Sequence, residues 1–401
     1  MKKIIFIANW TQGCELSGGD RIWIEFAKAW KNKLNITVIG SVEAIKISER
    51  YGLNDVMFLC SSDEIRSKNN LGVFSMLGNT LIRAVKGVRF IRSNSSGIDP
   101  ETKAVYSTSD FLADSLLALY LKIKNPKIVW IAGFYLFAPK PWVKGTPYKG
   151  INFFKGCLFY LSQLLIYWYI NRFADYVFVT SDPDVVRFIT KRRDMSRVIV
   201  IKGGVDTTES ERYLGSPDSN NRIYSYDACF LGRFHYQKGL LELIDIWKIV
   251  TKQKVNAKLA IIGSGPLEEK IKQKIKDLNL GMNIDLLGFL DGQPKFEIFK
   301  KSKIVLHPAT YDSGGMAAAE AMAWGLPGIS FDLEALKTYY PKGFLKASCF
   351  DLQGFADNII KLLDDKALYQ RLSQDAITLT RQWDWKIRAN QVIEYIDLDK
   401  E

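Results

Sequence analysis

Two carboxylates near the end of the chain lie in the pattern that most clearly suggests ligand chemistry. The segment Tyr311 to Phe331 reads YDSGGMAAAEAMAWGLPGISF, with Asp312 and Glu320 on either side of a glycine pair. Its run of alanines predicts a helix that begins near Met316. The first turn of a helix leaves backbone N–H groups without intrahelical partners, and such an end favours a phosphate.

The glycine pair and the spacing of the two acids indicate one shared ligand. Gly314 and Gly315 would let the backbone approach that ligand closely. Glu320 is about four residues into the expected helix, hence about 6 Å along its axis, and Asp312 is in the loop before it. A single molecule could therefore touch both acids.

This pattern resembles the E-x7-E signature of the GT-B glycosyltransferases of family 4, which are retaining enzymes that use nucleotide sugars. Asp312 stands where the signature has its first Glu. The stretch FLGRFHYQKG, residues 230–239, is similar to the family's strand and loop that carry a diphosphate-binding Arg and Lys. The resemblance implies that these are Arg233 and Lys238, which join Asp312 and Glu320 as the expected catalytic set. It implies donor contacts for Gly18, Gly19, Gly263, Gly265, Leu287, Gly288, Gly314, Gly315, Met316 and Glu320.

Other stretches extend the resemblance. IIGSGP, residues 261–266, and LLGFL, residues 286–290, follow at the spacing of the family's next two strands. SGGDR, residues 17–21, is similar to a glycine loop that faces the sugar and the acceptor, although a tight turn is the alternative. GGVD, residues 203–206, resembles an interdomain NGVD. Many members have a histidine in the first domain, whereas the corresponding WIAGFYLFAP, residues 130–139, offers only Tyr135 as an ionisable group.

Breaking the bond of a nucleotide sugar leaves a diphosphate whose developing charge must be stabilised. Arg233, Lys238 and the helix N-terminus at Gly315 could do this, because charge-assisted hydrogen bonds contribute about 1.5 to 3 kcal/mol each. We therefore expect no metal and no cofactor. The alternative is that these are ordinary exposed basic side chains. His235 could meet the donor or pack, and we expect a structural role for His307.

Composition indicates a folded, intracellular protein. The chain has 401 residues, of which 47% are hydrophobic and 24% charged, enough for two domains. Its five cysteines are scattered and form no CxxC pair, so the sequence predicts neither a disulfide framework nor a zinc site. The N-terminal apolar run is too short for a signal peptide, and no segment is expected to span a membrane. A cytoplasmic location follows as an expectation.

Apolar, β-branched runs alternate with helix-length segments, which predicts an α/β protein with two doubly wound, Rossmann-like domains. The family resemblance implies that these are the two domains of a GT-B fold, facing a central cleft. We expect domains at residues 1–206 and 207–380, with a C-terminal helix in 381–401 packing back on the first. Residues 207–222 are expected to be the linker. The expected strands are 3–8, 36–40, 104–107, 128–132, 176–180, 198–201, 229–231, 259–262, 284–287, 304–306 and 328–330.

Charge is divided unevenly along the chain. Residues 1–202 hold 29 Lys and Arg against 16 Asp and Glu, whereas residues 203–401 hold 26 against 27. With no nucleic-acid module in sight, an anionic membrane is the expected partner of the first half. Leu81 to Arg92 is a basic amphipathic segment with Arg83, Lys86 and Arg89, and its alternative is a solvated helix face. Residues 156–171 carry no charge and are expected to be too short to span a membrane.

These inferences combine into one hypothesis. The chain is expected to be a retaining, metal-independent glycosyltransferase that moves a sugar from a UDP- or GDP-sugar to a lipid-linked or cell-surface glycan precursor at the cytosolic membrane face. The alternatives are a nucleotide-sugar epimerase of the same fold and a catalytically degenerate nucleotide-sugar-binding scaffold.

Overall fold

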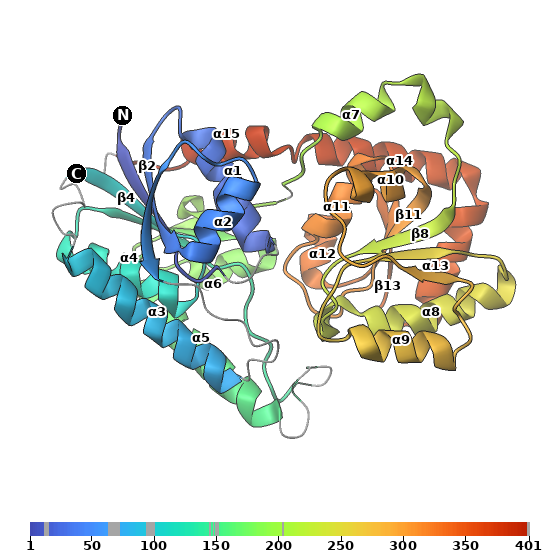
Figure 1. Ribbon diagram of the computed structural model, residues 1–401, viewed down its shortest axis with the longest axis horizontal. Helices are drawn as coiled ribbons and strands as arrows, with labels where there is room; N and C mark the ends of the chain where they lie inside the picture. Colours follow the sequence, from blue (N-terminus) through green and yellow to red (C-terminus); the bar gives the residue numbers. More distant parts are fainter. Residues whose placement is uncertain are drawn as a thin grey trace. The chain divides into compact units, whose positions relative to one another are not determined.

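The computed structural model describes residues 1–11, 16–62, 73–93, 101–143, 146, 148, 152–202 and 204–398. The chain forms two compact units, one comprising Met1–Ile201 and Trp385–Glu401, the other Lys202–Asp384 (Figure 1). We refer to them as unit 1 and unit 2. Each is built on a parallel sheet with helices packed against it, which confirms the predicted α/β class with two doubly wound sheets.

The sheet of unit 1 has seven strands in the order β3-β2-β1-β4-β5-β6-β7. Their bounds are β1 (Lys3–Ala8), β2 (Asn35–Ser41), β3 (Met57–Ser62), β4 (Thr102–Ser107), β5 (Val129–Gly133), β6 (Tyr176–Val179) and β7 (Val198–Val200). The central strands are buried on both faces, which explains their continuous apolar sequences.

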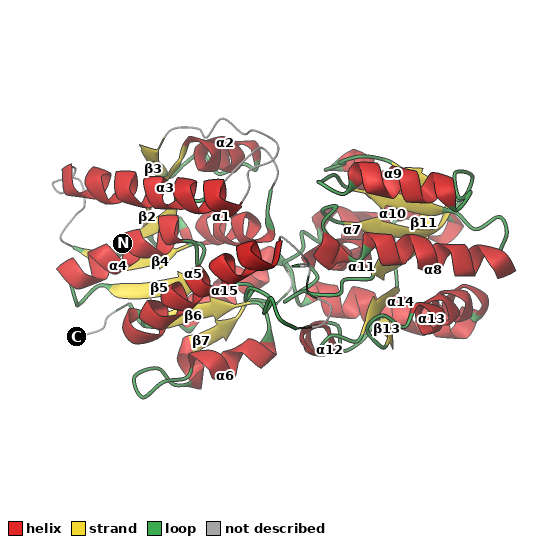
Figure 2. Cartoon of the chain, turned by 90° about the horizontal axis from the view of Figure 1, so that it is seen from below, coloured by secondary structure: helices red, strands yellow, loops and turns green. Residues whose placement is uncertain are grey.

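The helices of unit 1 cover both faces of this sheet. They are α1 (Gly18–Trp30), α2 (Val42–Arg50), α3 (Val73–Ser93), α4 (Leu112–Lys124), α5 (Asn152–Phe173), α6 (Val185–Phe188) and α15 (Trp385–Glu394), with 3-10 turns at Asp182–Asp184 and Met195–Arg197. The helices α3, α4 and α5 contact one another and lie along one side of the sheet (Figure 2). The C-terminal α15 packs on α1, where Trp30 Nε1 donates to the carbonyl of Ala389 at 2.8 Å.

Unit 2 has six strands in the order β10-β9-β8-β11-β12-β13. They are β8 (Tyr226–Leu231), β9 (Leu259–Ile262), β10 (Ile284–Leu286), β11 (Ser302–His307), β12 (Gly328–Phe331) and β13 (Phe344–Ala347). Its helices are α7 (Thr208–Leu214), α8 (Leu240–Gln253), α9 (Glu268–Asp277), α10 (Gln293–Lys300), α11 (Met316–Ala323), α12 (Glu334–Tyr339), α13 (Leu352–Asp364) and α14 (Lys366–Arg381), with 3-10 turns at Pro217–Asn221 and Tyr236–Lys238. The carboxyl ends of β8, β9, β10 and β11 share one edge of the sheet, where ligands bind in doubly wound folds.

Three local expectations were wrong. Residues 207–222 are not an extended linker, because they contain α7 and a 3-10 turn and belong to unit 2. The helix α5 has 22 residues and is the one described helix that is long and apolar enough, by length and composition alone, to cross a membrane. Arg83 does not face solvent, since it is 2% exposed. Its guanidinium donates to the backbone oxygens of Asn9 and Thr11 and forms an ion pair with Glu43.

Candidate functional site

The loops after β8 and β11 lie against each other at the carboxyl edge of the unit 2 sheet. The amide of Thr310 donates to the carbonyl of Gln237 at 2.9 Å. Gly239 has a φ of +66°, and a Cβ there would come within 1.9 Å of the Pro308 carbonyl oxygen. Only glycine suits this position, because it tolerates both the left-handed backbone and the close approach. This packing brings the predicted residue Lys238 beside the loop that carries Asp312.

The loop after β9 supports the loop that carries Arg233. A Cβ on Gly263 would lie 2.0 Å from the carbonyl oxygen of Gly232, and one on Gly265 would lie 2.7 Å from that of Phe234. Both glycines have positive φ values. The amide of Gly263 also donates to the carbonyl of Gly288 at 2.8 Å, at the end of β10. The expected donor-site residues of these loops thus lie at this edge: Gly263, Gly265, Leu287 and Gly288. Their contact with a donor stays a prediction.

Asp312 and Lys238 form an ion pair. Lys238 Nζ lies 2.6 Å from Asp312 Oδ2, and His307 Nε2 lies 3.3 Å from the same oxygen. The amide of Ser313 donates to Asp312 Oδ1 at 3.0 Å. The Asp312 side chain is only 8% exposed, whereas Lys238 is 21% exposed and can reach solvent or a ligand. In this structure Asp312 therefore orients Lys238.

The pKa values of this cluster follow from burial and the ion pair. Burial by itself would raise the pKa of Asp312, but the charge of Lys238 and the contact with His307 outweigh it and hold that pKa below its usual range. Burial, together with Lys238, lowers the pKa of His307 despite the nearby carboxylate. The pKa of His235 is lowered by burial and by the charges of Arg233 and Lys238. Near pH 7 the cluster holds an ionised Asp312 and neutral histidines.

Arg233 follows β8 and is exposed to solvent. Its charge acts on His235, two residues further along the loop, whose pKa it lowers. It thus lies in the same loop as Lys238, as the sequence predicted.

The helix α11 begins at Met316, and its N-terminal cap is Gly315. Gly314 and Gly315 both lack a positive φ in this structure. They are required for another reason: a Cβ on Gly315 would lie 1.9 Å from the hydroxyl oxygen of Tyr340, and one on Gly314 would lie 2.8 Å from the Tyr339 ring. The Tyr340 hydroxyl donates to the Gly315 carbonyl. Two tyrosines thereby fix the start of α11, where the first N–H groups are available to an anion.

Glu320 lies in α11 and is paired with a lysine that the sequence analysis did not single out. Lys295 Nζ, in α10, lies 2.6 Å from Glu320 Oε2 and 3.0 Å from Asp291 Oδ1. Burial would lower the pKa of Lys295, but the two carboxylates raise it. Glu320 keeps a 35% exposed side chain, so one of its faces stays open to a ligand.

The first-unit residues Gly18 and Gly19 open α1 and do not form a tight turn. Ser17 caps this helix, and its side chain accepts from the amide of Asp20, which in turn bonds back to Ser17. A Cβ on Gly19 would lie 3.4 Å from the Tyr135 ring. Gly203, the first residue of GGVD, lies outside the described residues. Contact of Gly18 and Gly19 with a donor stays a prediction.

Sequence analysis also missed two acids of unit 1, Asp114, which is buried, and Asp110, which is half-buried. Asp114 Oδ1 accepts from the amides of Asn9 and Trp10 at 2.7 and 2.8 Å, and burial raises the pKa of Asp114 to about 7. Burial likewise raises the pKa of Asp110 to about 6, although the Gln163 side chain donates to it. Both acids lie in the apolar stretch DFLADSLLALYL, residues 110–121, where they look like the polar residues at the start of an ordinary helix. Across the described residues, no three His, Cys, Asp or Glu side chains gather as a metal site would need.

The fold is that of the GT-B glycosyltransferases. A solved structure of the Anabaena protein HepE, in complex with UDP and glucose, superposes with a TM-score of 0.70 over 98% of this chain and 99% of that one, at 16% identity. A likeness at this identity establishes the fold alone.

Within that fold, residues 218–378 match the family model of the glycosyl transferases group 1. The matched region lies inside unit 2 and includes Arg233, Lys238, Asp312 and Glu320. The chain is similar to a poly(glycerol-phosphate) alpha-glucosyltransferase of Bacillus subtilis, with 28% identity over 180 residues, 42% of this chain and 26% of that protein. It is also similar to an uncharacterized glycosyltransferase of Methanocaldococcus jannaschii, with 35% identity over 116 residues, 29% of this chain and 28% of the relative. The chain thus matches about a quarter of the length of each.

Proposed function

We propose that this chain is a glycosyltransferase that binds a nucleotide-sugar donor on unit 2. One observation carries the proposal: Lys238 and Arg233 after β8, and the N-terminus of α11 after β11, lie at adjacent strand ends within the matched region. Two cations and a helix N-terminus suit the diphosphate of a nucleotide sugar. Glu320, further along α11, would accept hydrogen bonds from sugar or ribose hydroxyls.

The proposed reaction is retaining and needs no metal. The bond between the anomeric carbon and the diphosphate oxygen breaks, and the acceptor hydroxyl oxygen bonds to that carbon on the same face. The acceptor proton passes to the departing diphosphate oxygen. Arg233, Lys238 and the α11 N–H groups stabilise the negative charge on this leaving group. We assign no protein nucleophile.

The proposed acceptor is a lipid-linked or cell-surface glycan precursor, and the proposed location is the cytoplasm, at the inner face of the cell membrane. Two observations support this: the excess of positive charge in residues 1–202 and the similarity to an enzyme named for poly(glycerol-phosphate). No feature of the site favours the epimerase or the degenerate scaffold over transfer.

The first test is ligand binding. UDP or GDP should raise the melting temperature of the purified protein, because a ligand at 100 times its dissociation constant stabilises the folded state by about 2.7 kcal/mol. The free nucleosides, which lack the diphosphate, serve as matched controls and should shift it less.

The second test is catalysis with radiolabelled UDP-sugars, with and without EDTA. Transfer or slow donor hydrolysis should survive chelation. Loss of all activity in EDTA, with recovery on adding magnesium or manganese, would refute the metal-independent mechanism. Nucleotide binding without any turnover of a panel of sugars would point instead to a binding scaffold.

A further inference from the structure

The outer sides of α3 and α5, both in unit 1, expose apolar and basic side chains. In α5 the exposed apolar side chains include Phe154 near the start and then Leu161, Leu165 and Trp168 at three- or four-residue intervals, and Trp168 is 63% exposed. The inner side of the same helix is buried around Ile166. A helix that is apolar all round is normally covered on all sides. The outer side of α5 therefore needs a partner.

The helix α3 adds both apolar and basic side chains to this surface. Leu81, Ile82 and Val85 are exposed large hydrophobic residues, and Lys86, Arg89 and Arg92 are exposed cations. Neither α3 nor α5 contains an Asp or a Glu. The two helices contact each other and lie on the same side of the sheet (Figure 1). We call the docking surface the exposed residues Leu81, Ile82, Val85, Lys86, Arg89, Arg92, Phe154, Leu161, Leu165 and Trp168.

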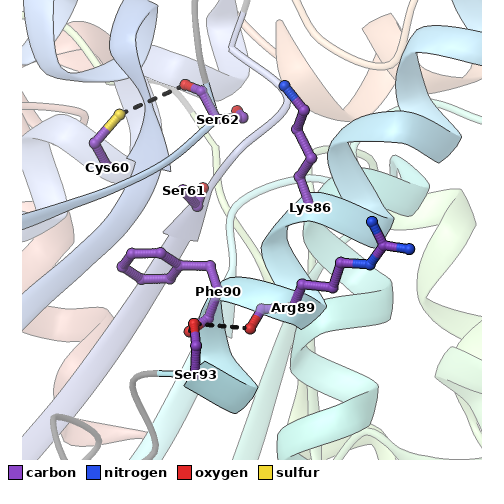
Figure 3. A pocket seen from close by; sticks show the side chains of 7 residues that line it. All are labelled: Cys60, Ser61, Ser62, Lys86, Arg89, Phe90 and Ser93. Carbon is purple, nitrogen blue, oxygen red and sulfur yellow. Dashed lines mark hydrogen bonds between the residues drawn. The ribbon is translucent and has the colours of Figure 1, made fainter.

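A shallow pocket of about 420 Å³ lies beside the cations of this surface, between α3 and β3. Figure 3 shows Lys86 and Arg89 extending from α3, with Ser61 and Ser62 on the strand opposite. The hydroxyls of both serines donate to Asn9 Oδ1, so Ser61 and Ser62 are held by the protein itself. The pocket gives a lipid phosphate a concave position at the edge of the docking surface.

The inner side of α5 shows that this helix stays on unit 1. Gln163, near the middle of the helix, accepts from the amide of Ala138 at 2.6 Å and donates to Asp110 and to the carbonyl of Leu136, both at 2.9 Å. The hydroxyl of Tyr169 lies 2.6 Å from that of Ser115. A spanning α5 would break these buried hydrogen bonds, which carry a large cost when left unmade. The helix thus presents only its outer side.

We propose that unit 1 rests on an anionic lipid bilayer through the docking surface, with α5 parallel to the membrane plane. Charge complementarity favours an anionic membrane over a second copy of the chain as the partner of this surface. A second copy of the chain would oppose the cations of one surface with those of the other, whereas an anionic leaflet neutralises them. The proposal deepens the membrane location given under the proposed function and does not depend on the donor chemistry.

The basic arm of the test uses flotation with vesicles of phosphatidylcholine, with or without phosphatidylglycerol. The full chain should bind the anionic vesicles at low salt and release them at high salt. Each basic residue near such a surface strengthens binding roughly fivefold, so changing Lys86, Arg89 and Arg92 together to Gln should weaken it by at least about tenfold. The control changes Lys252, Lys276 and Lys361 to Gln, which are exposed on unit 2 and alter the net charge equally. It should leave vesicle binding intact.

The apolar arm tests insertion. Changing Leu165 and Trp168 to Ser should reduce the binding that remains at high salt, whereas Val255 and Met282 to Ser, two exposed apolar residues of unit 2, should not. Lipids with brominated acyl chains should quench tryptophan fluorescence, and Trp168→Phe should remove part of that quenching. Unchanged melting temperatures and unchanged UDP binding show that the variants are folded.

Three results would overturn the proposal. If the basic triple variant and its control bind vesicles equally well, Lys86, Arg89 and Arg92 do not hold the protein on the membrane. If the lipid-free protein self-associates, and Leu165→Ser with Trp168→Ser abolishes this self-association, a second copy of the chain covers the docking surface. Protein that leaves membranes only in detergent means that α5 crosses them. If docking succeeds but UDP does not bind, the proposed function fails and the membrane surface stands.

Discussion

Lys238→Met is the most informative change at the proposed diphosphate site. Lys238 Nζ lies 2.6 Å from Asp312 Oδ2, so its charge is shared between this carboxylate and any diphosphate that arrives. Removing the ammonium removes one charge-assisted hydrogen bond to the ligand, about 1.5 to 3 kcal/mol. UDP should then bind roughly 10- to 150-fold more weakly, and uridine, which has no phosphate, should bind as before.

The ion pair predicts a second effect, which a double variant isolates. Without Lys238, Asp312 is left as a buried acid close to the diphosphate, and its negative charge repels the ligand. Asp312→Asn removes that repulsion, so Lys238→Met with Asp312→Asn should bind UDP more tightly than Lys238→Met alone. Burial should raise the pKa of Asp312 once Lys238 is gone, so the single variant should bind UDP more weakly as the pH rises and the acid ionises.

Isothermal titration calorimetry with UDP and uridine measures all of these quantities. Arg233→Met is the matched control, since it removes a cation from the same loop. It should weaken UDP binding by a similar amount, but Asp312→Asn should not relieve that loss. The reasoning is refuted if Lys238→Met weakens uridine and UDP equally, or if adding Asp312→Asn gives no recovery.

Three further predictions follow from the described contacts. Glu320→Gln should lower the rate of sugar transfer at least tenfold, about 1.4 kcal/mol, without unfolding the protein, and Lys295→Met should do the same by releasing Glu320. The control Lys303→Met breaks an ion pair with Asp227 elsewhere in unit 2 and should leave the rate unchanged. Steady-state kinetics measures all three variants. Gly315→Ala should destabilise unit 2 by about 1 to 3 kcal/mol in thermal unfolding, because its Cβ would meet the hydroxyl of Tyr340, and adding Tyr340→Phe should recover part of the loss. Folding raises the pKa of Asp114 to about 7, so the folded protein keeps a proton that the unfolded chain releases above the usual pKa of 3.8. The melting temperature of the wild type should therefore fall relative to that of Asp114→Asn as the pH rises from about 4 to 7. Parallel pH profiles of the two melting temperatures would contradict this.

The sequence predicted most strands correctly because central parallel strands are buried on both faces and appear as unbroken apolar runs. The two strands that it missed, β3 (Met57–Ser62) and β13 (Phe344–Ala347), are both at sheet edges. β3 is partly exposed and ends in two serines, and β13 has only four residues, one of them Lys346. The edge strands β7 and β10 were predicted, so what hid β3 and β13 is their partial exposure and polar residues, which break the apolar run.

Pairwise contacts at the site were harder to predict than its residues. Motifs placed Lys238 and Asp312 in the site, but 74 residues separate them, and their ion pair depends on β8 and β11 being neighbours in the sheet. Lys295 resembles many other lysines of the chain. Its signal was the stretch DGQPK, in which Asp291 stands four residues before Lys295 and Pro294 lies in the first turn of α10.

Periodicity also could not tell which basic residues of α3 are exposed. Arg83 and Lys86 both belong to the amphipathic pattern, yet Arg83 is buried against Glu43, whereas Lys86 is exposed. The partner of Arg83 lies in α2, 40 residues away. A helical pattern identifies a basic face, and only the neighbouring elements decide how much of that charge a membrane would meet.

If unit 2 binds a nucleotide sugar as proposed, the charges at the carboxyl edge of its sheet determine which groups attract this ligand. Lys238 is already neutralised by Asp312, and Lys295 by Glu320 and Asp291. We therefore expect a diphosphate that binds Lys238 to compete with the Asp312 carboxylate for its ammonium group. Arg233 is exposed, and the N–H groups of α11 carry partial positive charge. In the proposed reaction these groups would provide the initial attraction, and Lys238 would add stabilisation as the leaving diphosphate gains charge, which is when stabilisation accelerates the reaction.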